Sequence, residues 1–242
     1  MISERQTILV VDDETDTCAN LKDILTDLGY QVDVAYDGPS ALALVEQHPY
    51  DVALLDLKMP GMDGLELYRR IKKRRAGTVA IIVTAYAASE TAQAAQQAGA
   101  WQILPKPVNS THLLELIEEA SEQPLLMVVD DDSDLCDSLW DLFRERGYRV
   151  CLAHSAEDAE DRLRDREHKV VLIDMKLPGK SGGEVYRMVR ELSPTARTVV
   201  ITGFRSEMEQ LVDRVVEEGA DAVCYKPFDV GELLATVKQL TH

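Results

Sequence analysis

Two kinds of protein are disfavoured by what this sequence lacks. Its four cysteines form no CxxC pair, so a zinc site or a redox motif has little support. Met1 is not followed by a basic and apolar signal region, and no apolar run is long enough to span a bilayer. We therefore expect a cytoplasmic protein that makes no use of a membrane, with its cysteines as plain buried thiols.

Basic residues are also scarce. Lysine and arginine number 26 against 43 aspartate and glutamate residues, a formal net charge of −17 that both halves of the chain share. Direct nucleic-acid binding by the whole surface is therefore disfavoured. The strongest basic cluster, within residues 69–75, is typical of a solvated helix end, although an acidic partner or nucleic acid is the alternative reading.

What the sequence does have is a long internal repeat. Three polar residues recur at one constant spacing: Asp12, Asp56 and Thr84 return as Asp130, Asp174 and Thr202. A period this long marks duplicated domains and not a solenoid of small repeats. We predict one domain over 1–121 and a second over 122–242, joined near 121–124 without a Gly/Ser linker.

Short apolar runs alternate with helical patterns in each half. In the first half the expected strands lie near 8–11, 32–35, 52–56, 79–83 and 101–104. The expected helices lie near 21–28, 40–48, 64–75, 89–99 and 110–120. Strands that alternate with helices through short turns imply parallel βαβ units, so we predict an α/β fold with helices on both faces of each sheet.

The most informative stretch is an apolar run that ends in one carboxylate. Val52 to Leu55 suits a strand buried on both faces, Asp56 follows, and the chain then breaks at Pro60 and Gly61. The second half repeats this pattern around Asp174. Both acids are thus expected at the carboxyl end of a buried strand, where open α/β sheets keep their sites.

Each half should gather the same five polar side chains at that edge. They are Asp12, Asp13, Asp56, Thr84 and Lys106 in the first half, and Asp130, Asp131, Asp174, Thr202 and Lys226 in the second. Three neighbouring carboxylates would repel one another, and Mg²⁺ with its preference for oxygen ligands resolves this. A carboxylate beside Mg²⁺ can attack phosphorus and form an aspartyl phosphate, whose oxygens the lysine and the threonine would stabilise.

This set, in this order, resembles the receiver domain of two-component response regulators, and the resemblance covers nearly the whole chain as two complete copies. It implies two flavodoxin-like, doubly wound five-stranded parallel sheets, (βα)5 each, with Asp56 and Asp174 as phosphoacceptors. It implies Mg²⁺ held by Asp13 and Asp56, by Asp12 through water, and by the carbonyl of Lys58. The second copy would use Asp131, Asp174, Asp130 and the carbonyl of Lys176. The family also suggests cis peptides at Lys106–Pro107 and Lys226–Pro227.

The sequence departs from the family pattern in a few places. Receivers often carry an aromatic switch residue three positions before the lysine, where this chain has Ile103 and Val223. In the family, the positions of Lys58 and Tyr86, and of Lys176 and Phe204, flank the phosphoryl group. Bulky side chains there predict fairly long-lived phosphoryl groups, and the alternative is that they simply cover the rim of the site. Trp140 stands where the first copy has Lys22. Edge packing is the favoured interpretation, and a contact with a partner or between domains is the alternative.

These features predict a two-component or phosphorelay signalling protein with two receivers and no separate output domain. A histidine kinase or a histidine phosphotransfer protein would donate the phosphoryl group, and a downstream protein target would read it; a homodimer is also expected to be possible. The chain would not be an enzyme beyond catalysing phosphoryl transfer to its own aspartate and its hydrolysis. One alternative is an interaction scaffold or phosphate sink with a single phosphorylated receiver. The other, a Mg²⁺-dependent phosphohydrolase, would usually need a second acid where Lys58 and Lys176 stand.

Overall fold

The chain divides into two compact units, Met1–Gln123 and Pro124–His242, and the computed structural model describes residues 6–85, 89–203 and 209–242. In unit 1 the elements are β1 (Thr7–Val11), α1 (Thr15–Asp27), β2 (Gln31–Ala35), α2 (Gly38–Gln47), β3 (Val52–Asp56), α3 (Gly64–Arg74), β4 (Val79–Thr84), α4 (Ser89–Ala98), β5 (Gln102–Pro105) and α5 (Ser110–Glu122). Helix α5 extends past residue 121, so the first unit is slightly longer than the sequence suggested.

Unit 2 repeats this alternation of strands and helices. Its elements are β6 (Leu125–Val129), α6 (Ser133–Arg144), β7 (Arg149–Ala153), α7 (Ala156–Asp165), β8 (Val170–Asp174), α8 (Gly182–Leu192), β9 (Arg197–Thr202), α9 (Glu209–Glu217), β10 (Ala222–Tyr225) and α10 (Val230–Thr241). Among the described residues, no helix combines the length and the apolar character needed to cross a membrane.

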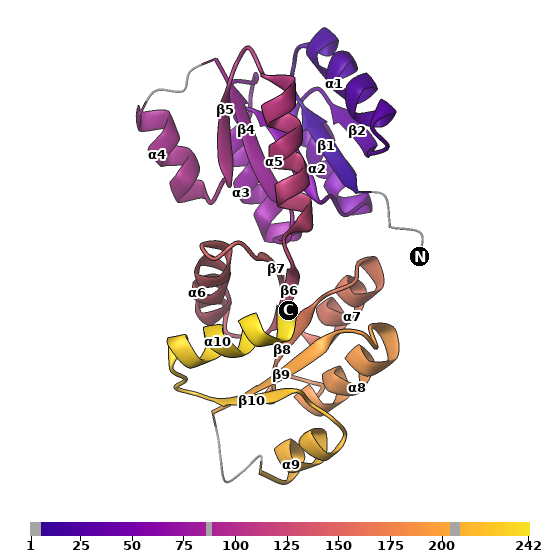
Figure 1. Cartoon of the computed structure of the whole chain (residues 1–242), viewed down its shortest axis with the longest axis vertical. Coiled ribbons are helices and arrows are strands. Elements are labelled where there is room, and N and C mark those ends of the chain that lie inside the picture. The colour runs from indigo at the N-terminus through magenta and orange to yellow at the C-terminus, as the bar shows by residue number, and fades with distance from the viewer. Residues whose placement is uncertain (1–5, 86–88, 204–208) are drawn as a thin grey trace. The chain divides into compact units, whose positions relative to one another are not determined.

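Each unit contains one five-stranded sheet in which all pairings are parallel (Figure 1). The strand order is β2-β1-β3-β4-β5 in unit 1, and unit 2 has the matching order β7-β6-β8-β9-β10. This is the doubly wound, flavodoxin-like arrangement, which confirms the predicted fold. The order reverses between β1 and β3, and between β6 and β8, so the crevice at the carboxyl ends of these strands is where such sheets place their ligands.

Alternate residues of the central strands face two separate helical layers. In unit 1, Leu9 and Val11 of β1 pack in the core formed with α2, α3 and α4, whereas Ile8 and Val10 pack in the core formed with α1 and α5. This alternation follows from the pleat of a strand that is covered on both faces. In the central strands β1, β3 and β4 the polar residues lie only at the strand ends.

Two glycines allow a helix to start directly against the strand that carries each central aspartate. Gly64 is the first residue of α3, and a Cβ atom there would overlap the carbonyl oxygen of Asp56; Gly182 of α8 stands in the same relation to Asp174. Any larger residue would push the helix away from the strand end. The side chain of Asp63 caps α3 by accepting a hydrogen bond of 2.7 Å from the backbone N–H of Glu66.

None of the four cysteines forms a disulfide, and three of them are buried, with Cys224 half-buried. Trp140 is also buried, and the guanidinium carbon of Arg144 lies 5.2 Å from the centroid of its ring. Within the basic cluster of α3, Glu66 pairs with Arg69 and with Arg70. The basic residues Lys72, Lys73 and Arg74 lie in the last turn of α3, where their charge complements the helix dipole, in agreement with the interpretation of this cluster as a helix end.

His168 is a buried histidine at the start of β8 with no hydrogen-bond partner for either ring nitrogen. Burial lowers the pKa of His168 from 6.5 to about 3, and the charges of nearby arginines add to this, although the backbone of Arg166 favours the charged ring. At the equivalent place in unit 1, Tyr50 donates a hydrogen bond of 2.7 Å to Asp33. Unit 2 has Cys151 where Asp33 stands, so the imidazole has lost that acceptor.

We expect unit 2 to lose stability in mild acid because of His168. The unfolded chain binds a proton below pH 6.5 and the folded unit does not, so the free energy of unfolding falls as the pH drops toward 3. Between pH 8 and pH 5 this one group should cost unit 2 about 2 kcal/mol. His168→Phe should remove that part of the pH dependence.

The measurement is urea denaturation at both pH values in a Trp101→Phe background, in which Trp140 is the remaining tryptophan and reports on unit 2. Trp140→Phe, which leaves Trp101, gives the matched control for unit 1. Equal acid sensitivity of His168→Phe and its parent would contradict the expectation.

Candidate functional site

The predicted site residues lie at the carboxyl ends of four adjacent strands in each unit. In unit 1, Asp12 follows β1, Asp56 ends β3, Thr84 ends β4 and Lys106 follows β5. Parallel strands bring these ends to one edge of the sheet. Unit 2 places Asp130, Asp174, Thr202 and Lys226 at the same points of its own sheet.

In unit 1 a lysine bridges two buried carboxylates. The Nζ atom of Lys106 lies 2.8 Å from Oδ2 of Asp12 and 2.8 Å from Oδ1 of Asp56. Both aspartates are almost fully buried, with 4% and 7% of their surface exposed. The second oxygen of Asp56 accepts a hydrogen bond of 2.7 Å from the backbone N–H of Lys58, so this carboxylate is fixed on both sides.

Unit 2 has the same contacts. Lys226 Nζ lies 2.7 Å from Oδ2 of Asp130 and 3.1 Å from Oδ2 of Asp174. The backbone N–H of Lys176 donates to Oδ1 of Asp174 at 3.2 Å. The repeated geometry shows that the two sites are built from equivalent residues, as the spacing of the repeat predicted.

Burial and charge oppose each other at these carboxylates. Burial raises the pKa of Asp56 and of Asp174, and this outweighs the hydrogen bonds and positive charge of Lys106 and Lys226, which favour the ionised form. For Lys106 burial alone would lower the pKa, but its hydrogen bonds to Asp12 and Asp56 reverse this and raise it. Each lysine therefore stays charged, and a further cation nearby would stabilise the ionised form of the neighbouring acids.

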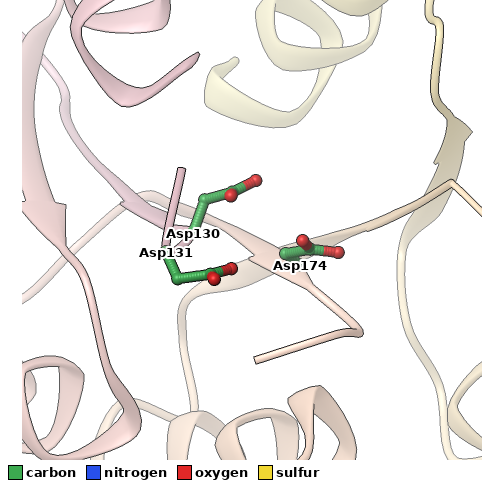
Figure 2. A group of neighbouring side chains, drawn as sticks. All are labelled: Asp130, Asp131 and Asp174. Atoms are coloured by element: carbon green, nitrogen blue, oxygen red, sulfur yellow. The ribbon is translucent and has the colours of Figure 1, made fainter. Parts of the chain in front are cut away.

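The acidic side chains of unit 2 form a group that could hold a metal ion. One carboxylate oxygen from each of Asp130, Asp131 and Asp174 lies within 4.8 Å of the other two (Figure 2). Oxygen ligands of this kind, two buried and one exposed, suit a hard divalent cation that keeps part of its water, such as Mg²⁺. Among the described residues, this is the only group of three potential ligand side chains that comes so close together.

In unit 1 the corresponding acids are present but are arranged less tightly. Asp13 is exposed, as Asp131 is, but among the described residues only the acids of unit 2 form a group whose oxygens all lie within 4.8 Å of one another. The donor chemistry, with carboxylates at the same edge of the sheet, fits Mg²⁺ here as well. This difference between the two units could not be predicted from two identical sets of residues.

The two threonines of the sites are buried, and the two residues at the expected switch positions pack against the cores. Thr84 and Thr202 are buried at the ends of β4 and β9, and their carbonyl oxygens accept hydrogen bonds of 2.8 Å and 2.7 Å from the backbone N–H of Lys106 and Lys226. Ile103 and Val223 are partly buried and pack against the core beneath α4 and α9. The Lys106–Pro107 and Lys226–Pro227 bonds are cis, as expected. Tyr86 and Phe204 lie outside the described residues.

Some contacts near the site were not predicted from the sequence. The thiols of Cys18 and Cys136 donate to the carbonyl oxygens of Asp12 and Asp130, and Nδ1 of His154 contacts the carbonyl oxygen of Asp130. The matched positions of the two cysteines were a visible signal, but nothing in the sequence indicated what the thiols contact.

The fold and the site together define a doubly wound α/β protein with an acidic, lysine-bridged edge in each of two repeated units. Residues 8–118 and 126–238 match the family model of the response regulator receiver domain. A response regulator receiver protein of Anaeromyxobacter sp. (strain Fw109-5) is 36% identical over 232 residues, which cover 96% of this chain and 94% of that protein. The chain therefore belongs to the response regulator receiver family and carries two copies of its domain.

Two similar solved structures each cover about half of this chain. A CheY-like receiver domain protein from Methanospirillum hungatei is 39% identical and covers 49% of this chain and 95% of its own, with a TM-score of 0.48. Response regulator TrrA of Thermotoga maritima, solved in complex with Mg²⁺ and BeF, is 33% identical and covers 48% of this chain and 98% of its own, with a TM-score of 0.44.

Proposed function

We propose that each unit accepts a phosphoryl group, on Asp56 in unit 1 and on Asp174 in unit 2. The observation that carries this proposal is the lysine that contacts two buried acids in both sites. A carboxylate oxygen attacks the phosphorus atom of a phosphohistidine donor, the P–N bond breaks, and its electron pair leaves with the imidazole, which takes up a proton. A histidine kinase or a histidine phosphotransfer protein would supply such a donor.

The side chains around the acceptor have separate tasks in this reaction. Lys106 and Lys226 balance the charge of the transferred group, and the hydroxyls of Thr84 and Thr202 donate to one of its oxygens. Asp13 and Asp56, with Asp12 through water and the carbonyl of Lys58, would hold Mg²⁺ in unit 1; Asp131, Asp174, Asp130 and the carbonyl of Lys176 would do so in unit 2. When bound, Mg²⁺ neutralises negative charge on the acceptor and on the phosphoryl oxygens.

Acetyl phosphate tests the proposal without a cognate kinase. Incubation of the protein with this donor and Mg²⁺ should add two phosphoryl groups per chain, seen as two mass increments in intact-mass spectrometry. EDTA in place of Mg²⁺ is the control and should prevent labelling. A chain that gains neither group with acetyl phosphate, and does not respond to beryllofluoride, would refute the proposal.

One observation favours a second candidate, in which a single unit carries the signal. Among the described residues, only the acids of unit 2 gather closely enough to form a ready cation site. In that case the chain would act as a scaffold or phosphate sink, and only Asp174 would be labelled. Both versions act through protein contacts with a downstream target, with a homodimer as one arrangement.

A phosphohydrolase is the least supported function. Such an enzyme would usually need a second acid two residues after the nucleophile, and Lys58 and Lys176 occupy those positions with exposed side chains. We therefore propose that the chain catalyses only the phosphorylation of its own aspartates and their hydrolysis.

The phosphoryl groups should be long-lived because these lysines flank the acceptors. Bulky side chains at the rim hinder the in-line approach of water, so the label should persist well beyond seconds at neutral pH. Following the phosphorylated mass after removal of acetyl phosphate measures this directly, and Lys58→Ala should shorten the lifetime in unit 1 only. Decay within seconds in the unmodified protein would contradict the expectation.

A further inference from the structure

Each site contains a buried thiol that contacts the backbone of its first acid. The Sγ atom of Cys18 donates to the carbonyl oxygen of Asp12 at 3.3 Å, and Sγ of Cys136 donates to that of Asp130 at 3.3 Å. Both cysteines are 0% exposed and lie in the first turns of α1 and α6. The same contact at equivalent positions of two units indicates a shared task and not incidental packing.

The carbonyl that accepts this bond belongs to the peptide that joins the two neighbouring acids of the site. Because a peptide unit is planar, fixing the carbonyl of Asp12 also fixes the N–H of Asp13 and hence the direction in which that residue leaves the strand. The carboxylate of Asp12 is held separately, since Oδ1 accepts a bond of 2.9 Å from the N–H of Glu14 and Oδ2 contacts Lys106. The hydrogen bond from the thiol therefore helps to fix the position of the backbone that carries the exposed acid, Asp13.

Unit 2 adds another contact to the same carbonyl. Nδ1 of His154 lies 3.3 Å from the carbonyl oxygen of Asp130, and since that oxygen can only accept, a hydrogen bond here requires the form of the ring with a hydrogen on Nδ1. The backbone N–H of His154 donates to Asp158 of α7 at 3.1 Å, which anchors the loop that presents the ring. Unit 1 has Tyr36 at this position, and its side chain is 51% exposed. The unit with the extra donor is also the unit whose three acids gather closely.

We propose that Cys18 and Cys136 are positioning residues for the cation-binding acids, and that His154 shares this task in unit 2. The inference rests on the proposed function, because it assigns the thiols to the acids that would hold Mg²⁺. It predicts that unit 1 depends on its thiol more strongly than unit 2 does. It also predicts that a serine hydroxyl, which donates in the same direction, replaces the thiol, whereas a methyl group does not.

The test is a Mg²⁺ titration of the full chain without any phosphodonor, followed by the amide NMR signals of each unit. Cys18→Ala should weaken Mg²⁺ binding by unit 1 about tenfold, the range seen when an outer-shell partner of a metal ligand is lost. Cys18→Ser should restore binding to within about threefold of the unmodified chain. Unit 2, in the same sample, provides an internal reference that should not change.

The same titration separates the two donors of unit 2. Cys136→Ala alone should weaken Mg²⁺ binding by unit 2 less than Cys18→Ala weakens unit 1, and Cys136→Ala combined with His154→Ala should reach about tenfold. Cys224→Ala, on β10, is the matched control and should leave both units unchanged.

Two outcomes overturn the inference. One is unchanged Mg²⁺ affinity in a Cys18→Ala protein whose amide spectrum shows folded units. The other is equal weakening by Cys18→Ala and Cys18→Ser, because lost packing and not a lost donor would then be the cause. If the unmodified chain bound no Mg²⁺ and took no label from acetyl phosphate, the proposed function itself would fail, which is a distinct result.

Discussion

The Asp56→Asn variant should take up roughly half as much phosphate as the unmodified chain, and the Asp174→Asn variant should do the same. Asparagine keeps the shape of aspartate, but its neutral amide is not a nucleophile, so each change removes one acceptor and leaves the other unit intact. The double variant should carry none. Intact-mass spectrometry after treatment with acetyl phosphate and Mg²⁺ counts the groups on each protein.

The pattern of the two single variants distinguishes the proposed functions. If Asp174→Asn abolished labelling while Asp56→Asn left it unchanged, unit 2 alone would accept phosphate, as its closer acid group suggests. Asp27→Asn, which changes the last residue of α1, at the opposite end of that helix from Asp12, is the control for a lost carboxylate. Full labelling of the double variant would show that the phosphate resides elsewhere and would contradict the assignment of both acceptors.

Much of this site could be predicted from the sequence because strand ends are easy to locate. An apolar run followed by one acid and a Pro-Gly turn fixes where Asp56 and Asp174 lie along the chain, and parallel strands then place them at a common edge. The recurrence of Lys106 as Lys226 gave the third member of each set. In both units the structure brings these residues into contact.

The parts that could not be predicted depend on side-chain orientation. Asp13 and Asp131 occupy equivalent positions, yet among the described residues only the three acids of unit 2 lie within 4.8 Å of one another. The burial of His168 without a hydrogen-bond partner could not be predicted either. Its equivalent, Tyr50, donates to Asp33, and the residue that replaces Asp33 in unit 2 is Cys151, which lies on a different strand, β7. Contacts of this kind depend on rotamers and on strand register, and neither is encoded in residue spacing.

The largest effect on stability is expected for Lys106→Met. Replacement of the ammonium group by a neutral thioether leaves Asp12 and Asp56 buried as neighbouring negative charges, with no cation between them. Breaking a buried ion pair by deleting one partner usually costs 3–5 kcal/mol, and because Lys106 is partly exposed we expect unit 1 to lose about 3 kcal/mol in EDTA. Urea denaturation followed by the fluorescence of Trp101, in a Trp140→Phe background, measures the loss.

Two conditions should reduce this loss, and both follow from the charge of the site. Mg²⁺ supplies the missing positive charge, so its addition should restore part of the stability if the acids of unit 1 bind it. Lower pH should also reduce the loss of stability. Burial already raises the pKa of Asp56 in the folded unit, and without Lys106 the folded state takes up protons more readily than the unfolded chain. The free energy of unfolding of the variant should therefore recover as the pH falls. Lys22→Met, on the exposed side of α1, is the control and should show neither effect. If Lys106→Met were as stable as the unmodified chain in EDTA, the lysine would not be compensating the buried acids, and the electrostatic account of the site would be wrong.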